Sequence, residues 1–132
     1  MKTFTLAVLL LAGAAAPAVA QDTSPAKLIA GYEAAAGTAA DPAAGKDLFL
    51  AEHGGGKPET PSCTTCHTAD PRAGGQTRAG KAIDPLAPAA NGQRMTDTGK
   101  VEKWFGRNCN SVLGRDCTAA EKANIIAWLA SL

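Results

Sequence analysis

The sequence has few aromatic residues and no excess of charge of one sign. Phe, Trp and Tyr make up 5% of its 132 residues, and 13 lysines and arginines nearly balance 12 aspartates and glutamates. Proteins that bind nucleic acid or anionic membrane surfaces normally carry a basic excess, so this balance argues against both kinds of partner. β-Branched residues are also few, whereas alanine and glycine are common. This composition favours helices joined by loops.

The sequence also lacks a strong transmembrane segment. The apolar run at residues 4–16 is too short and too rich in alanine for a stable span, which needs about 20 apolar residues. Lys2 precedes this run, and the small residues Ala18-Val19-Ala20 follow it, as in a secretory signal peptide. We therefore expect residues 1–20 to be removed after Ala20. The mature chain, residues 21–132, is then one exported, periplasmic domain without net charge, because Lys2 is lost.

Two of the four cysteines belong to a motif with specific chemistry. Residues 63–67 read Cys-Thr-Thr-Cys-His, the attachment signature of c-type haem. Spaced i and i+3 on a helical turn, the thiols of Cys63 and Cys66 face one way and can form thioethers with the two vinyl groups of a porphyrin. His67 then lies under the porphyrin plane as the proximal iron ligand. The motif predicts one covalently bound haem c.

Three other interpretations of these cysteines are weaker. A thioredoxin-like redox pair requires a βαβ context, but glycine and proline precede this motif. A zinc site formed by all four cysteines would need a second short cysteine pair, whereas Cys109 and Cys117 are separated by seven residues. A disulfide between Cys63 and Cys66 would leave His67 without a role.

The remaining cysteines, Cys109 and Cys117, are expected to form a disulfide in an oxidising periplasm. In the chain-entropy model such a short loop contributes about 2–3 kcal/mol to the free energy of unfolding. The alternative is a pair of buried free thiols.

Start and stop signals predict four helices besides the haem motif. Ser24-Pro25 and Asp41-Pro42 open the first two. The first ends before Gly37 and the second before the glycines at 54–56, with His53 at its end. A third helix covers 98–107, and a capping box at 118–121 opens the last. This order matches an all-α bundle of the class I cytochrome c type wrapped around one haem. Gly45 and Phe49 share a helix face, which allows a close crossing with another helix.

Residues 68–91 read as a loop that wraps the porphyrin. Pro85 is our candidate to offer a backbone carbonyl to the second nitrogen of the proximal imidazole. Arg72, Arg78 and Lys81 are candidates to contact the haem propionates, although ordinary solvated loop charge is the better interpretation for each of them.

The sixth iron position decides between an electron carrier and a ligand-binding haem. Met95, the methionine outside the predicted signal peptide, is one candidate, and a loop-packing methionine is at least as good an interpretation. Asn108, expected at the end of the third helix beside Cys109, is another, although asparagine there normally serves as a left-handed helix cap. His53 is a third, and a solvent-exposed histidine at a helix terminus is the favoured interpretation. The residues alone leave this choice open.

The chain resembles one family, the sphaeroides haem proteins (SHP), from about residue 22 to residue 132. The resemblance rests on residues 22–33 and 61–67 and, above all, on Gly-Arg-Asn-Cys-Asn-Ser at 106–111 with Gly-Arg-Asp-Cys at 114–117. It implies a high-spin monohaem cytochrome with His67 and Asn108 as axial ligands and a Cys109–Cys117 bridge. It also implies that Asn108 leaves the reduced iron, which then binds oxygen or nitric oxide. A diheme cytochrome c is the implied redox partner, and no catalytic residues of a dedicated enzyme are expected.

Overall fold

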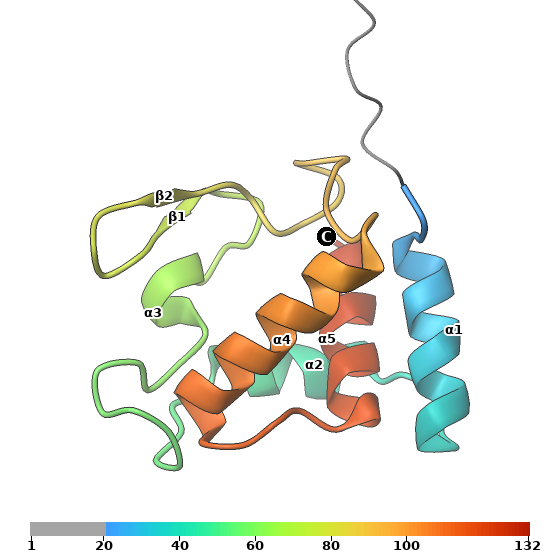
Figure 1. Ribbon diagram of the computed structural model, residues 1–132, viewed down its shortest axis with the longest axis horizontal. Coiled ribbons are helices and arrows are strands. Elements are labelled where there is room, and N and C mark those ends of the chain that lie inside the picture. The colour runs from blue at the N-terminus through green and yellow to red at the C-terminus, as the bar shows by residue number, and fades with distance from the viewer. Residues whose placement is uncertain (1–20) are drawn as a thin grey trace, which may run out of the picture.

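The computed structural model describes residues 21–132, so the predicted signal peptide lies outside the described residues. The described part contains five α-helices and one small antiparallel hairpin (Figure 1). In chain order the elements are α1 (Pro25–Ala36), α2 (Pro42–Leu50), α3 (Thr64–His67), β1 (Gly75–Gln76), β2 (Ala82–Ile83), α4 (Thr98–Leu113) and α5 (Ala119–Ala130). The predicted all-α architecture is confirmed. The hairpin was not predicted, since residues 68–91 were expected to form only a loop.

The C-terminal helix α5 forms the centre of the packing, with α1 and α2 both against it. The core cluster consists of Phe49 of α2 and Ile125, Trp128 and Leu129 of α5. Gly45 permits the predicted close crossing of α2 and α5. A Cβ at this position would lie 2.7 Å from the backbone nitrogen of Ile125 and closer still to the carbonyl of Asn124.

The predicted helix starts are confirmed by their caps. The Ser24 hydroxyl accepts a hydrogen bond from the Lys27 amide at 3.3 Å, and the Asp41 carboxylate accepts one from the Ala43 amide at 2.9 Å. Thr118 opens α5 with both bonds of the capping box present. These side chains satisfy amides that have no partner within the helix, which fixes where each helix begins.

The end of α2 differs from the prediction. The helix stops at Leu50 rather than running to the glycines, so His53 lies beyond it. His53 is not a solvent-exposed terminal residue, as expected, but is half-buried, with its Nε2 2.9 Å from the carbonyl oxygen of Leu48. This bond folds the chain back onto the end of the helix.

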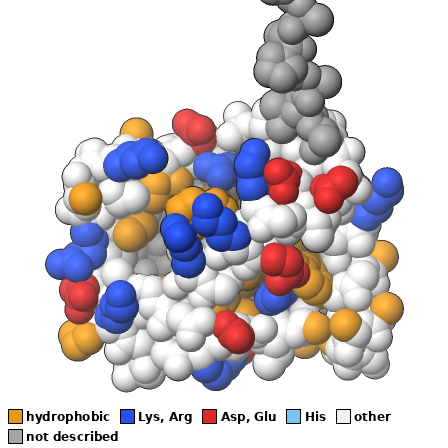
Figure 2. All heavy atoms as spheres, viewed as in Figure 1, with side chains coloured by type: hydrophobic (Ala, Val, Ile, Leu, Met, Phe, Trp, Pro, Cys, Tyr) orange, Lys and Arg blue, Asp and Glu red, His pale blue; other side chains and the backbone are white. Residues whose placement is uncertain are grey.

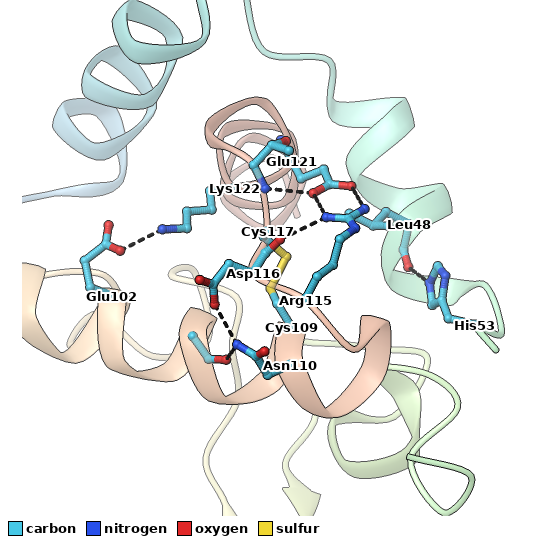
Figure 3. The surroundings of a disulfide bond; sticks show 12 residues. Leu48, His53, Glu102, Cys109, Asn110, Arg115, Asp116, Cys117, Glu121 and Lys122 are labelled. Atoms are coloured by element: carbon cyan, nitrogen blue, oxygen red, sulfur yellow. Dashed lines mark hydrogen bonds and ion pairs between the residues drawn. A yellow bond between two sulfur atoms is a disulfide. The ribbon is translucent and has the colours of Figure 1, made fainter. Parts of the chain in front are cut away.

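The extent of α4 was also predicted wrongly. The helix continues six residues past Arg107 to Leu113, and its left-handed cap is Gly114 (φ 71°), so Asn108 is not a cap. The reason lies in the side chain of Asn110, which donates to the carbonyl of Gly106 at 2.8 Å and to the carboxylate of Asp116 at 2.6 Å (Figure 3). These bonds satisfy a polar side chain that otherwise competes with helical backbone bonds.

Among the described helices, none is long and apolar enough to cross a membrane.

Candidate haem-binding site

A small cavity of about 50 Å³ lies between the haem motif and the C-terminal half of α4. Its lining comes from the segment before α3, from the motif and from α4, and consists of Thr60, Ser62, Cys63, Cys66, His67, Asn108, Ser111 and Val112. The structure therefore brings together the two motif cysteines, the predicted proximal histidine and the predicted asparagine ligand. Asn108 reaches the cavity from a different segment, far from the motif in sequence.

The two motif cysteines are free thiols on a single helical turn. Ser62, directly before them, anchors this turn. Its hydroxyl donates to the carbonyl of Phe49 at 3.3 Å and accepts from the amide of Thr64 at 3.2 Å. The motif is thereby tied to α2, whose Phe49 belongs to the core cluster.

The electrostatics of Cys63 argue against a thiol–disulfide redox role. Burial raises the pKa of its thiol to about 11, with the nearby Cys66 also raising it. A thioredoxin-like nucleophile requires a lowered pKa, because the thiolate is the reactive form. A half-buried, protonated thiol next to a second free thiol instead suits covalent attachment to an apolar group. The raised pKa of Cys63 therefore argues against a redox pair at this motif.

His67 is held in the form that binds a metal ion. Burial lowers the pKa of its imidazole, and the positive charge of Arg94 lowers it further. The ring is therefore neutral near pH 7, as iron ligation requires. It lies 6.2 Å from the ring of Phe49, measured between centroids.

The predicted contact between Pro85 and His67 is wrong. His67 Nδ1 is buried and has no hydrogen-bond partner among the described residues. The carbonyl of Pro85 instead accepts from Arg94 Nε at 2.8 Å, and the carbonyl of Asp84 accepts from Arg94 Nη2 at 2.6 Å. A cationic donor makes a stronger hydrogen bond than a neutral one, so the Pro85 carbonyl bonds to Arg94 rather than to the neutral ring of His67.

The predicted disulfide is confirmed. Cys109 of α4 is bonded to Cys117, with their Cα atoms 5.6 Å apart (Figure 3). These sulfurs are unavailable to a metal, and the described residues contain no group of three or more His, Cys, Asp or Glu residues able to hold one. The four-cysteine zinc interpretation is therefore wrong, as is the pair of free thiols at these positions.

Asn108 lies in the helix directly before the disulfide. Its side chain lines the same cavity as the motif residues Cys63, Cys66 and His67. A carboxamide and a neutral imidazole that line one cavity can both donate a lone pair to a group bound between them.

The glycines at 55 and 56 have a role that the sequence did not reveal. A Cβ on Gly56 would lie 2.6 Å from backbone atoms of Val112 and closer still to the carbonyl of Ser111. The Lys57 amide donates to that same carbonyl at 2.8 Å. The chain leading into the haem motif thus lies directly on the last turns of α4. The glycine triplet was interpreted only as the end of a helix.

The other predicted residues lie away from the cavity. Met95 is partly buried and packs against the core cluster. Arg72 pairs with Asp70 at 3.0 Å and Arg78 with Glu59 at 3.4 Å, all four largely exposed. Lys81 is exposed beside the hairpin. Basic and acidic side chains are interspersed over the visible face of the molecule (Figure 2), which fits ordinary solvated charge.

Comparison with known proteins matches a family model, a curated relative and solved structures, and these agree with one another. The model described as a domain of unknown function (DUF1924) matches residues 35–129. The cytochrome c-type protein SHP of Cereibacter sphaeroides is 63% identical over 131 residues, which are 99% of each chain. The solved structure of oxidised SHP, described as an oxygen-binding cytochrome c, has a TM-score of 0.82 at 66% identity, covering 84% of this chain and 99% of that one. The solution structure of cytochrome c″ of Methylophilus methylotrophus, described as giving insights into haem-ligand detachment, has a TM-score of 0.70 at 37% identity, covering 82% and 93%.

Two free thiols, a neutral imidazole with an unpartnered second nitrogen and a carboxamide in the same cavity form a donor set that fits a covalent haem. The identity to SHP extends over nearly the whole chain, and the helical fold is the same. This chain belongs to the SHP family of c-type cytochromes and carries one covalently bound haem c.

Proposed function

We propose that this protein is a periplasmic cytochrome c that transfers electrons and, when reduced, binds oxygen or nitric oxide at a haem iron freed by the departure of Asn108. The observation that carries the proposal is the cavity that Cys63, Cys66, His67 and Asn108 line together, whereas Met95 is not among its lining residues. The oxygen binding ascribed to SHP and the haem-ligand detachment ascribed to cytochrome c″ support it.

Cys63 and Cys66 hold the haem through thioether bonds, and His67 serves as its proximal ligand. Bound haem supplies one-electron redox chemistry and two axial positions. His67 is kept neutral by burial, so its ring nitrogen is free to bind the iron without losing a proton. Arg78 and Lys81, on the exposed turn of the hairpin, are the candidate contacts for the propionates.

Asn108 acts as the redox-dependent ligand. Its carboxamide oxygen is a neutral, hard and weak donor, which suits ferric iron and suits ferrous iron poorly. With haem bound, one electron from a redox partner, for which a diheme cytochrome c is the candidate, would weaken the hold on Asn108, and its side chain would need no proton transfer to leave. Its departure would free a position for a diatomic ligand. A methionine sulfur prefers ferrous iron and would keep the position closed.

The signal-peptide pattern at residues 1–20 and the disulfide support a periplasmic location. Residues 1–20 act as a signal peptide, and residues 21–132 form the mature cytochrome. A disulfide such as Cys109–Cys117 persists in an oxidising compartment and is rare in a reducing one.

The test is to exchange the two candidate ligands separately. The ferric protein is expected to show a high-spin spectrum. Asn108→Ala should keep its fold and bind cyanide faster in the ferric state, because no side chain must first be displaced. Met95→Leu conserves apolar volume and should leave both the spectrum and ligand binding unchanged. If Met95→Leu instead abolishes the sixth-ligand band while Asn108→Ala changes nothing, the protein is a closed His/Met electron carrier.

A further inference from the structure

A pair of hydroxyl groups lies in the cavity beside Asn108. Thr60 Oγ1 is 2.8 Å from Ser111 Oγ and donates to the carbonyl of Ser111 at 3.0 Å. Both residues line the cavity together with His67 and Asn108. Neither was predicted to take part in the site, since an isolated serine and threonine carry no sequence signal.

We propose that the Thr60–Ser111 hydroxyl pair receives the carboxamide of Asn108 when that side chain leaves the iron. The inference rests on the proposed function, in which Asn108 is the redox-dependent ligand. Ser111 follows Asn108 by three residues on α4, and side chains at this spacing are neighbours on one helix face. The carboxamide therefore reaches Ser111 Oγ by side-chain rotation alone.

The backbone of α4 is held in place both next to Asn108 and at Ser111. Cys109, next to Asn108, is fixed by its bond to Cys117. The carbonyl of Ser111 accepts from the amide of Lys57 at 2.8 Å as well as from Thr60. Since α4 is tied at these points, moving the whole helix to release Asn108 would break several bonds, whereas rotating the side chain breaks none of them.

The pair also has the hydrogen-bonding capacity that a released amide needs. While Thr60 donates to the Ser111 carbonyl, the Ser111 hydroxyl donates to Thr60 Oγ1 at 2.8 Å, and its oxygen can still accept from the carboxamide NH₂ group. The third hydroxyl of the cavity, Ser62, is already engaged, because it donates to the Phe49 carbonyl and accepts from the Thr64 amide. Without a partner, a polar group freed in a half-buried cavity is penalised. The Thr60–Ser111 pair therefore shifts the equilibrium of the Asn108 side chain between its iron-bound and its released position towards the released one.

The experiment measures carbon monoxide affinity of the dithionite-reduced holoprotein in three variants. Ser111→Ala removes the hydroxyl and raises helix propensity, so the fold is not threatened. It should weaken carbon monoxide binding about threefold to tenfold, the effect of losing one ordinary hydrogen bond. Ser111→Thr keeps a hydroxyl and should restore binding to within about twofold. Ser131→Ala is the matched control, since it deletes a hydroxyl that donates to the carbonyl of Trp128 at 2.7 Å on α5, outside the cavity.

A crystal structure of the reduced protein supplies a readout independent of ligand binding. It should place the Asn108 carboxamide about 3 Å from Ser111 Oγ. A carboxamide that points elsewhere, or a Ser111→Ala variant with unchanged affinity, overturns the role of the pair. If the wild-type ferrous protein binds no carbon monoxide at all, the proposed function itself fails, so the two failures are distinguishable.

Discussion

Replacing Gly56 by alanine should separate the haem segment from α4. The new Cβ would lie 2.6 Å from backbone atoms of Val112, well inside contact distance, and those atoms cannot rotate away as a side chain would. Overpacking of this kind costs about 1–3 kcal/mol. The lower conformational entropy of the unfolded alanine chain offsets about 0.4–1 kcal/mol. We therefore expect a net destabilisation of about 1–2 kcal/mol, or roughly 5–10 °C in melting temperature for a chain of this size.

The matched control is Gly54→Ala, two residues earlier in the same triplet. A Cβ at Gly54 meets no atom within 4 Å, and neither glycine has a positive φ, so alanine is sterically admissible there. Thermal unfolding of the ferric holoproteins, followed by far-UV circular dichroism, should show Gly54→Ala melting at or above the wild type and Gly56→Ala clearly below it. Equal melting temperatures for the two variants would refute the contact. Because α4 carries Asn108, the Gly56 variant should also bind ferric ligands at an altered rate.

Two further predictions concern the ties around the end of α4. Converting both Cys109 and Cys117 to serine should lower the free energy of unfolding by about 2.5 kcal/mol, since the bridge joins residues with a separation of 8. Cyanide should also bind the ferric protein faster, because the end of α4 loosens. An unchanged denaturation midpoint in guanidinium would contradict this prediction. The hydrogen bond from Arg115, with that from Thr118, lowers the pKa of Glu121 to about 2 from its ordinary 4.5. A folded-state pKa below the unfolded value gives stability that is present above about pH 4.5 and is lost as the pH falls towards 2. The unfolding midpoint should therefore decrease more between pH 7 and pH 2.5 in the wild type than in Glu121→Gln. An equal decrease in the two proteins would show that the Glu121 carboxylate contributes nothing to this pH dependence.

The features that were predicted correctly depend on short stretches of sequence. The caps at Ser24, Asp41 and Thr118 mark helix starts because a side chain bonds an amide two or three residues away. The haem motif is likewise contained in five residues. The Cys109–Cys117 bridge followed from counting, because two cysteines were left over in a chain expected to be exported.

The features that were missed depend on partners distant in sequence. The helix α4 continues past Asn108 because the Asn110 side chain donates a hydrogen bond to the carboxylate of Asp116, which lies beyond the end of the helix. The carbonyl of Pro85 is taken by Arg94, a residue that was assigned no role. Thr60 and Ser111 are 51 residues apart and form a pair only after the glycines bring their segments together. Local patterns do not encode such bonds.

The position of Asn108 inside a helix bears on how the proposed switch works. A capping asparagine at a frayed helix end would bring along a mobile backbone, so its release would be a loop movement. Within α4 the disulfide at Cys109 and the Lys57 bond to Ser111 hold the backbone close to Asn108. The mobile element is then one side chain, and rotations of single side chains are far faster than helix or domain movements. The site should therefore open after reduction without a separate slow conformational step. The observed rate of ligand binding to the ferrous protein, measured after rapid reduction, should then rise in proportion to ligand concentration and should not reach a slow plateau.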